Sequence, residues 1–358
     1  MRLPRARDAH RAVDERHEAR ADGGDDAAEL ARDLERHRGE SMNRSVNRSF
    51  DASFSAASRH SAPRRAPRAS GAENAAPSMR LETYEAIRRE IAATPCDAHP
   101  NVDALRAAHP ELTLDALVSI ASQESSRRIR AAHGRQVRAI EAHARRYLLG
   151  EDVFSVAQNL DFPACQLMRL LLEHLLGVGH KAVGALLRDP HGKIPATPAA
   201  GTPAAARGAK LCRRLRLDVE RVTAWDHHAS PAVDALRHNA GKEYEELLEE
   251  MLAAEGIPFV TERDLRADGH ARTPDIKLEV PIAVRGRIVN WIDSKASFSD
   301  PLVHVEKGVE QFQGYVNRFG PGMVIYWHGI VDELNDDPNV LLVDAFPPSS
   351  DIVKLRMI

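Results

Sequence analysis

The sequence predicts an α/β protein in which an all-α region precedes a mixed-sheet core with the order helix, three strands, helix, strand. Up to about residue 190 the apolar residues recur at helical spacing, whereas from residue 258 they alternate as in strands. Of the 17 aromatic residues, eleven lie between Trp225 and Phe346. The largest core is therefore expected in the second half of the chain.

Composition excludes several classes of protein. The 358 residues carry 49 basic and 52 acidic side chains, a formal charge of −3, which excludes a uniformly basic protein of the histone type. Three cysteines fit neither a disulfide framework nor a four-cysteine zinc site. No apolar run approaches the roughly 20 residues that span a bilayer, so no membrane partner is expected.

Residues 1–78 are predicted to be disordered. They are rich in Ala, Arg, Asp and Ser, and so few large apolar side chains cannot offset the entropy of an ordered chain. The stretch after Met42 is Ser/Arg/Ala-rich like a transit peptide, but residues 1–50 contain eleven acidic residues, which transit peptides lack. Organellar import is therefore expected only if translation starts at Met42.

Residues 79–190 are predicted to be helical and to contain an element like a helix-turn-helix. Two apolar helical stretches flank the turn Asp161-Phe162-Pro163, the outline of a DNA-reading corner over 152–176. Any small helical bundle has such corners, so a packing module without DNA contact is an equal interpretation.

A basic stripe lies within the same region. Between Arg127 and Arg146 the only acid is Glu141. The stripe could contact nucleic-acid phosphates, or it could be a solvated helix face in an Arg-rich chain. Its arginines are Arg127, Arg128, Arg130, Arg135, Arg138, Arg145 and Arg146.

Residues 191–222 are predicted to be a linker, and residues 223–350 the core. The core begins with a helix over Pro231–Ala254, which Gly256 and Pro258 end, and a short strand over Pro258–Thr261. Alternating apolar residues then predict a hairpin that turns at Arg285-Gly286-Arg287.

Three charged residues are expected to meet at one end of this hairpin. Asp275 starts its first strand, and Asp293 and Lys295 end its second. A side-chain period of two places Val289, Trp291, Asp293 and Lys295 on one face of the returning strand.

Two neighbouring carboxylates favour a bound cation because they repel each other. Mg²⁺ takes oxygen ligands and keeps several waters, so two carboxylates and a substrate phosphate suit it. A nearby Lys can orient a water and offset developing negative charge. The pattern therefore indicates Mg²⁺- or Mn²⁺-dependent phosphodiester hydrolysis, against the alternative of a surface salt bridge.

The motif Pro-Asp, seventeen residues, Asp-Ser-Lys is typical of the PD-(D/E)xK nuclease superfamily, whose core is restriction-endonuclease-like. The helices before and after this motif carry further candidate site residues. On the first, Glu245 shares an edge with Leu248 and Leu252; on the second, which follows Lys295, lie Gln311 and Tyr315. Glu246 and Glu250 on the first helix are expected to be solvated.

The stretches Thr273-Pro274-Asp275, Trp291 to Phe298 and Asn317 to Gly322 resemble the codanin-interacting nuclease family. The resemblance implies Asp275, Asp293 and Lys295 as catalytic residues, with Glu245 and Gln311 supporting them. It implies Mg²⁺ (or Mn²⁺) on Asp275, Asp293 and Glu245, with the Ser294 carbonyl as a further candidate ligand, and Tyr315 near the nucleic acid. It also implies a nuclear role beside a codanin-like partner. Animal relatives usually have Glu where Asp293 stands.

Two other functions stay open. The chain could be a catalytically silent adaptor that keeps a nuclease fold to bind nucleic acid or a chromatin-associated partner. It could also be a transcription regulator that reads DNA through residues 152–176. DNA is favoured over RNA as the substrate, and a nuclear or cytoplasmic location is expected.

Overall fold

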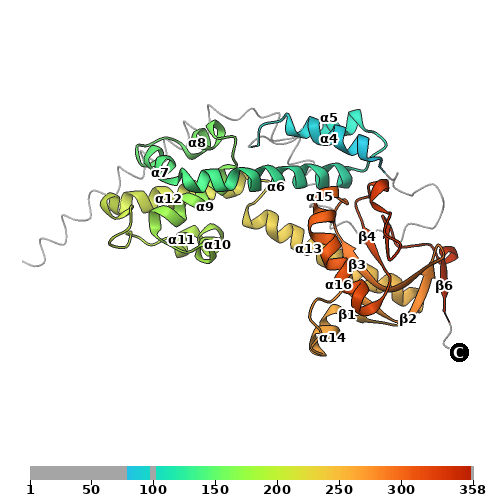
Figure 1. Ribbon diagram of the computed structural model, residues 1–358. Helices are drawn as coiled ribbons and strands as arrows, with labels where there is room; N and C mark the ends of the chain where they lie inside the picture. The colour runs from blue at the N-terminus through green and yellow to red at the C-terminus, as the bar shows by residue number, and fades with distance from the viewer. Residues whose placement is uncertain (1–78, 97–101, 356–358) are drawn as a thin grey trace, which may run out of the picture. The chain divides into compact units, whose positions relative to one another are not determined.

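The computed structural model describes residues 79–96 and 102–355, which all belong to one structural unit, Ser70–Ile358 (Figure 1). The predictions of disorder in residues 1–78 and of import from Met42 concern residues outside that description.

The helical region is confirmed as all-α over the described residues up to Trp225. It contains a 3-10 turn, Ala205–Arg207, and the helices α4 (Leu81–Ala92), α5 (Val102–Ala108), α6 (Leu114–Arg138), α7 (Ile140–Leu148), α8 (Val153–Asn159), α9 (Ala164–Leu176), α10 (His180–Arg188), α11 (Pro190–Lys193) and α12 (Gly208–Trp225).

Helix α9 is the centre of this region. Nine of its thirteen residues are buried, and the other four, Gln166, Arg169, Glu173 and His174, are half-buried. Helices α7, α8, α10 and α12 pack around it. A recognition helix needs an exposed face to enter the major groove. Residues 152–176 do form two helices joined by a turn. Because no residue of α9 is fully exposed, its burial favours the interpretation of this corner as a packing module, and DNA reading stays a prediction.

The predicted linker over 191–222 is wrong in its second half, which belongs to α12. Leu211, Leu215, Val219 and Val222 follow one another at helical spacing and are buried, and α12 packs on α9. The neighbouring arginines obscured this apolar stripe in the sequence. Irregular chain remains over residues 194–204.

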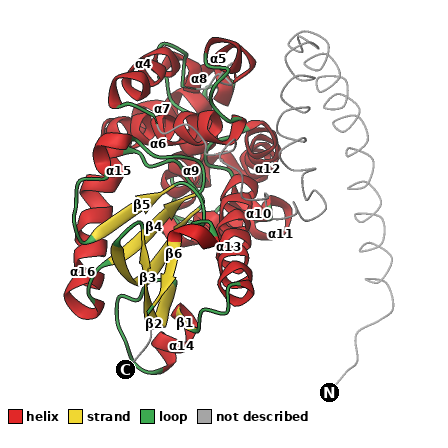
Figure 2. Cartoon of the chain, turned by 90° about the vertical axis from the view of Figure 1, so that its right-hand side faces the viewer, coloured by secondary structure: helices red, strands yellow, loops and turns green. Residues whose placement is uncertain are grey.

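The second half of the described chain forms a mixed six-stranded sheet (Figure 2). The strand order is β1-β2-β3-β4-β5, and β6 also pairs with β2; β1, β2, β3 and β6 are joined antiparallel, whereas β3, β4 and β5 run parallel. The strands are β1 (Phe259–Thr261), β2 (Ile276–Val284), β3 (Arg287–Lys295), β4 (Gly322–Tyr326), β5 (Val340–Val343) and β6 (Ile352–Lys354). The helices are α13 (Pro231–Ala254), α14 (Glu262–Ala267), α15 (Pro301–Val303), α16 (Val309–Phe319) and a π-helical turn, His304–Gly308; two 3-10 turns are Asp332–Leu334 and Ser349–Asp351.

Local signals explain where these elements begin and end. The Ser230 hydroxyl accepts a bond from the Val233 amide and caps α13, Pro231 occupies the first helical position, and Gly256 ends the helix with a φ of 63°. The β2–β3 turn places Arg285 and Gly286 at φ 49° and 77°, as a two-residue hairpin requires. The predictions of α13 and of the hairpin are confirmed.

Two apolar clusters cover the two faces of the sheet. Leu248 and Leu252 of α13 pack with Ile292 on one face. Phe312 and Tyr315 of α16 pack with Trp291 on the other. The prediction that Val289 shares the face of Trp291 is wrong, because Val289 belongs to the α13 cluster. The β2–β3 register shifts between Lys277 and Ile282, and such irregularities break the strict alternation of faces.

Among the described residues, no single helix has the length and apolar character needed to cross a membrane. The consecutive helices α9 and α10 together meet the length and composition criteria, but they bend by 115° at their junction.

Candidate active site

Asp275 lies where the chain enters β2, and the backbone fixes it there. Its Oδ2 accepts a hydrogen bond of 2.7 Å from the amide of Ser294 on β3, and its own carbonyl accepts one of 2.8 Å from the Glu262 amide. The hairpin pairing of Ile276 with Ile292 explains the first contact, because it places the start of β2 beside the end of β3. The sequence prediction that these two strand ends converge is confirmed.

Asp293 and Lys295 stand two residues apart on β3 and form an ion pair through Asp293 Oδ2 and Lys295 Nζ. The Asp293 side chain is only 1% exposed, whereas that of Lys295 is 30% exposed. The ammonium also lies 5.9 Å from the ring centroid of Phe312 on α16. The pair therefore has a buried carboxylate and a cation that reaches the surface.

The charges of the site act strongly on one another. Burial and the neighbouring Asp293 carboxylate raise the pKa of Asp275 well above its ordinary value, although Lys295 and the Ser294 amide oppose this. Burial acts to lower the pKa of Lys295, but Asp293, Asp275 and Glu245 outweigh it and raise that pKa. Lys295 is therefore a protonated cation throughout the neutral range.

Glu245 belongs to this electrostatic cluster. It lies on α13 and is exposed, as Glu246 and Glu250 also are. Burial and the carboxylates of Glu262 and Asp293 raise the pKa of Glu245, whereas Lys295 lowers it. The two solvated glutamates were predicted correctly, and Glu245 alone of the three faces the catalytic charges.

The donor set was tested for its fit to a divalent cation. Both carboxylate oxygens of Asp293 are buried, and the Lys295 ammonium is the charge that balances them. In an extended strand the N–H and C=O of one residue point to the same side, so the Ser294 carbonyl faces the Asp275 side with its amide. No three His, Cys, Asp or Glu side chains within 79–96 and 102–355 are grouped closely enough to hold a metal by themselves. Two carboxylates and a carbonyl still fit Mg²⁺, which keeps several waters.

Gln311 and Tyr315 are joined on α16. Gln311 Nε2 donates to the Tyr315 hydroxyl over 2.6 Å, and that hydroxyl donates to the Thr273 carbonyl over 2.9 Å. Tyr315 is 2% exposed and packs edge-on against Trp291 at a centroid distance of 5.1 Å. The Tyr315 ring is enclosed in the core, and its contact with nucleic acid stays a prediction. Its hydroxyl holds the backbone two residues before Asp275.

The predicted basic stripe divides into two groups. Arg127, Arg128 and Arg146 are tied to carboxylates: Arg127 pairs with Glu124 and Asp300, Arg128 with Asp161, and Arg146 with Glu151. The other four are exposed and pair with no carboxylate of the described chain; they are Arg130, Arg135, Arg138 and Arg145. The exposed arginines of the second group are therefore the candidates for a nucleic-acid contact, whereas the ion pairs of the first group stabilise the fold.

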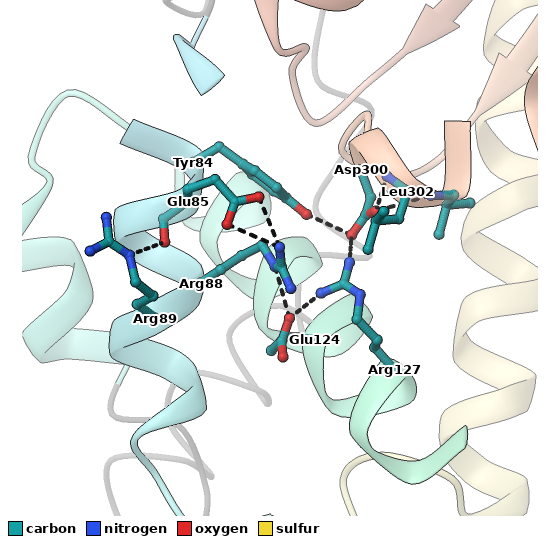
Figure 3. A network of polar contacts seen from close by, with 9 residues as sticks. Tyr84, Glu85, Arg88, Arg89, Glu124, Arg127, Asp300 and Leu302 are labelled. Atoms are coloured by element: carbon teal, nitrogen blue, oxygen red, sulfur yellow. Dashed lines mark hydrogen bonds and ion pairs between the residues drawn. The ribbon is translucent and has the colours of Figure 1, made fainter. Parts of the chain in front are cut away.

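A buried polar network joins α4 and α6 to the segment that follows β3 (Figure 3). The Tyr84 hydroxyl donates to Asp300 Oδ2 over 2.6 Å, and the Arg127 guanidinium reaches the same oxygen. Arg127 also pairs with Glu124, to which Arg88 donates over 2.9 Å. Asp300 Oδ1 accepts from the amides of Leu302 and Val303 and caps α15. Asp300 thus ties the helical region to the chain five residues after Lys295.

Sequence reasoning missed this network and the residues around the Asp275 loop. Tyr84, Glu124 and Asp300 are far apart in the sequence, and no spacing pattern links them. Helix α14 had a local signal, because Thr261 and Asp264 form a capping box in which each side chain accepts the other's backbone amide.

No solved structure matches the chain. Residues 211–346 match a family model described as a protein of unknown function with the TPD sequence motif. The chain is 34% identical over 290 residues to CDAN1-interacting nuclease 1 of Mus musculus, which covers 76% of this chain and 96% of that protein. The human protein of the same name is 34% identical over 260 residues, which are 68% of this chain and 86% of the relative.

A more distant match is an uncharacterized protein of Acanthamoeba polyphaga mimivirus, 34% identical over 114 residues, which are 30% of this chain and 41% of the relative. The mouse and human alignments extend beyond the sheet region to most of the chain. The chain belongs to the CDAN1-interacting nuclease 1 family.

Proposed function

We propose that this protein is a divalent-metal-dependent nuclease of the PD-(D/E)xK type that hydrolyses phosphodiester bonds of nucleic acid, with DNA as the first substrate to test. The observation that carries the proposal is the convergence of Asp275, Asp293 and Lys295 at the ends of β2 and β3. The element order helix, three strands, helix, strand supports it, as does the name nuclease carried by the relatives.

Asp275 and Asp293 would hold Mg²⁺ or Mn²⁺, with the Ser294 carbonyl as a further ligand and Glu245 in support. When bound, the ion would polarise the scissile phosphodiester and lower the pKa of a coordinated water. It would also relieve the repulsion between the two carboxylates that raises the Asp275 pKa.

The protein's own groups have separable roles. Lys295 keeps its proton at neutral pH, so it acts as a positive charge that orients the water and balances charge on the phosphate rather than as a base. Tyr315, through the Thr273 carbonyl, and Gln311, through Tyr315, are positioning residues for the loop that carries Asp275. A misplaced carboxylate costs rate because the catalytic groups must be oriented within a fraction of an ångström.

A codanin-like partner and a nuclear role form the second part of the proposal. The partner is suggested by the name of the relatives, CDAN1-interacting nuclease 1. Co-expression of the full chain with a codanin homologue, followed by size-exclusion chromatography, tests it. Co-elution is expected, and separate elution of two folded proteins contradicts it. Imaging of the tagged chain in cells tests the location.

The decisive test of the activity compares Asp293→Ala with Glu246→Ala. Both remove one carboxylate, but Glu246 is exposed on α13 outside the catalytic cluster. With linear, flap, splayed-arm and junction DNA and matching RNA, Asp293→Ala should lower Mg²⁺-dependent cleavage at least about 10³-fold, whereas Glu246→Ala should change it less than about twofold. Cleavage by Asp293→Ala at the wild-type rate would refute the site.

The second candidate is a catalytically silent adaptor. It is favoured by one observation, the direct ion pair of Lys295 with Asp293, which balances the carboxylate without a metal. Calorimetric titration with Mn²⁺ discriminates between the two. A nuclease binds the ion and loses binding in Asp275→Ala, whereas an adaptor with a closed ion pair binds none.

A further inference from the structure

A polar groove opens beside the catalytic centre. It has a volume of about 420 Å³, and α14, α16 and the loop before Asp275 line it. Glu262 of the groove donates its amide to the Asp275 carbonyl over 2.8 Å, and Tyr315 of the groove donates to the Thr273 carbonyl over 2.9 Å. Ligand sites in proteins commonly have volumes between about 300 and 1,000 Å³. The groove is therefore large enough for part of a nucleic-acid strand that continues from the catalytic carboxylates.

Two arginines line this groove, and each is held by a weak ion pair. Arg272 Nη2 lies 3.1 Å from Glu310 Oε1, and Arg266 Nη2 lies 2.7 Å from Glu262 Oε1. The side chains of both arginines are 67% exposed, and that of Glu310 is 74% exposed. Such pairs contribute little to stability, so an incoming phosphate can replace the carboxylates. A guanidinium forms two parallel hydrogen bonds to a phosphate.

The backbone at Arg272 supports a functional role for this residue. Arg272 has a φ of 56°, a left-handed conformation that L-residues rarely adopt. The other two described non-glycine residues with positive φ, Asp161 and Arg285, also lie in connections between consecutive elements, but neither lines the groove. Strained residues of this kind cluster at ligand sites, where the strain fixes a side chain in place. Arg272 lies three residues before Asp275, at the rim of the groove.

We propose that this groove binds the phosphodiester backbone beside the scissile bond, with Arg272 and Arg266 as phosphate ligands and Glu310 as a competing anion that holds Arg272 until a phosphate replaces it. The inference rests on the proposed nuclease function and adds the strand-binding site to it. Substitution of Glu310 should then change the affinity for nucleic acid in the opposite direction to substitution of Arg272, because removing the Glu310 carboxylate frees the Arg272 guanidinium for the phosphate. A merely structural ion pair would instead make the two substitutions equivalent.

The test measures binding without cleavage. A fluorescein-labelled 20-nucleotide DNA, single-stranded or annealed to its complement, is titrated in EDTA with fluorescence anisotropy. Arg272→Gly removes the guanidinium and keeps the loop, because glycine adopts a positive φ without strain. The matched control is Arg263→Ala, which removes an exposed arginine of α14 that does not line the groove.

Arg272→Gly should weaken binding about tenfold at 100 mM salt and reduce the slope of log affinity against log salt by about 0.7–0.9, the value for one lost phosphate contact. Arg266→Ala should weaken it several-fold, and Arg263→Ala less than about twofold. Glu310→Gln should tighten binding about threefold, and this gain should vanish in the double variant with Arg272→Gly.

Three results overturn the inference: wild type that binds neither form of the DNA, Arg272→Gly that binds within about twofold of wild type, or Arg263→Ala that weakens binding as much as Arg272→Gly. Failure of the nuclease proposal is distinguishable. A chain that binds DNA through Arg272 but never cleaves it contradicts the proposed nuclease activity and supports the groove as a strand-binding site. A chain that cleaves with Mg²⁺ while binding independently of Arg272 refutes the groove alone.

Discussion

The hydroxyl of Tyr84 lies 2.6 Å from Oδ2 of Asp300 in the interior of the protein, and it connects the first helix of the helical region to the segment that leaves the catalytic strand (Figure 3). Asp300 is 2% exposed and Tyr84 is 1% exposed, so water cannot replace the bond. Tyr84 also stacks on Phe298 at a centroid distance of 5.7 Å.

Tyr84→Phe should lower the free energy of unfolding by about 1.5–3 kcal/mol, because it removes a buried hydrogen bond to a charged group and keeps the ring. Equilibrium urea unfolding measures this. Arg89→Ala is the control, since among the described residues Arg89 bonds only the carbonyl of Glu85, on the exposed side of α4. It should change stability by less than about 0.5 kcal/mol. Equal losses in the two variants would contradict a special role for the Tyr84–Asp300 bond.

Lys295→Ala should destabilise the metal-free protein by about 3 kcal/mol, because it leaves the Asp293 carboxylate buried without a compensating charge. Loss of cleavage in Lys295→Ala therefore needs a stability control before it is read as a catalytic effect. The double variant Asp293→Ala/Lys295→Ala removes both charges and should recover most of the loss. Urea unfolding in EDTA of the single and double variants gives the coupling energy, and additive losses would show that the pair is not coupled.

The raised pKa of Asp275 predicts how stability depends on pH. The folded state binds this proton more tightly than the unfolded chain, whose carboxyl titrates near pH 4. The contribution is therefore fully present below about pH 4 and is lost as pH rises through the higher folded pKa.

We expect the stability of the metal-free wild type to fall, relative to Asp275→Asn, as pH increases from about 4 towards neutral. Asparagine keeps an oxygen to accept the Ser294 amide and cannot ionise, so it removes only the titration. Unfolding free energies in EDTA at a series of pH values measure the difference between the two proteins. A difference that stays constant with pH contradicts the prediction.

Gly322 allows Trp291 to occupy its place beside the catalytic strand end. A Cβ at residue 322 would lie 2.1 Å from Cε2 of the Trp291 ring, and the indole N–H is bonded to the Gly320 carbonyl over 2.8 Å. Gly322→Ala should therefore destabilise by about 1–3 kcal/mol or more, and it should reduce cleavage, because Trp291 stands two residues before Asp293.

Gly314→Ala is the matched control on α16, where nothing lies within 4 Å of an added Cβ. Alanine favours helix over glycine by about 0.8–1 kcal/mol, so this variant should gain stability. Thermal unfolding of both variants gives opposite signs if the packing is as described, and a destabilised Gly314→Ala alongside a neutral Gly322→Ala would refute it.

Elements whose signals are local could be predicted from the amino-acid sequence. Apolar spacing, caps and turn residues specified α13, the β2–β3 hairpin and the meeting of Asp275 with Asp293 and Lys295, because antiparallel pairing across a short turn leaves little freedom. The helical character of residues 81–190 was predictable for the same reason.

Which helix faces are buried, and what each arginine contacts, depends on the packing of the folded chain. The sequence left open whether α9 reads DNA or packs in a bundle, and the neighbouring helices bury nine of its thirteen residues. The basic residues of α12 masked an apolar stripe that packs against α9. Arg127 and Arg130 lie in the same basic stretch of the sequence, yet Arg127 forms an ion pair with Asp300 whereas Arg130 is exposed. The physical reason is that burial and ion pairing depend on side chains distant in sequence, which no local pattern encodes.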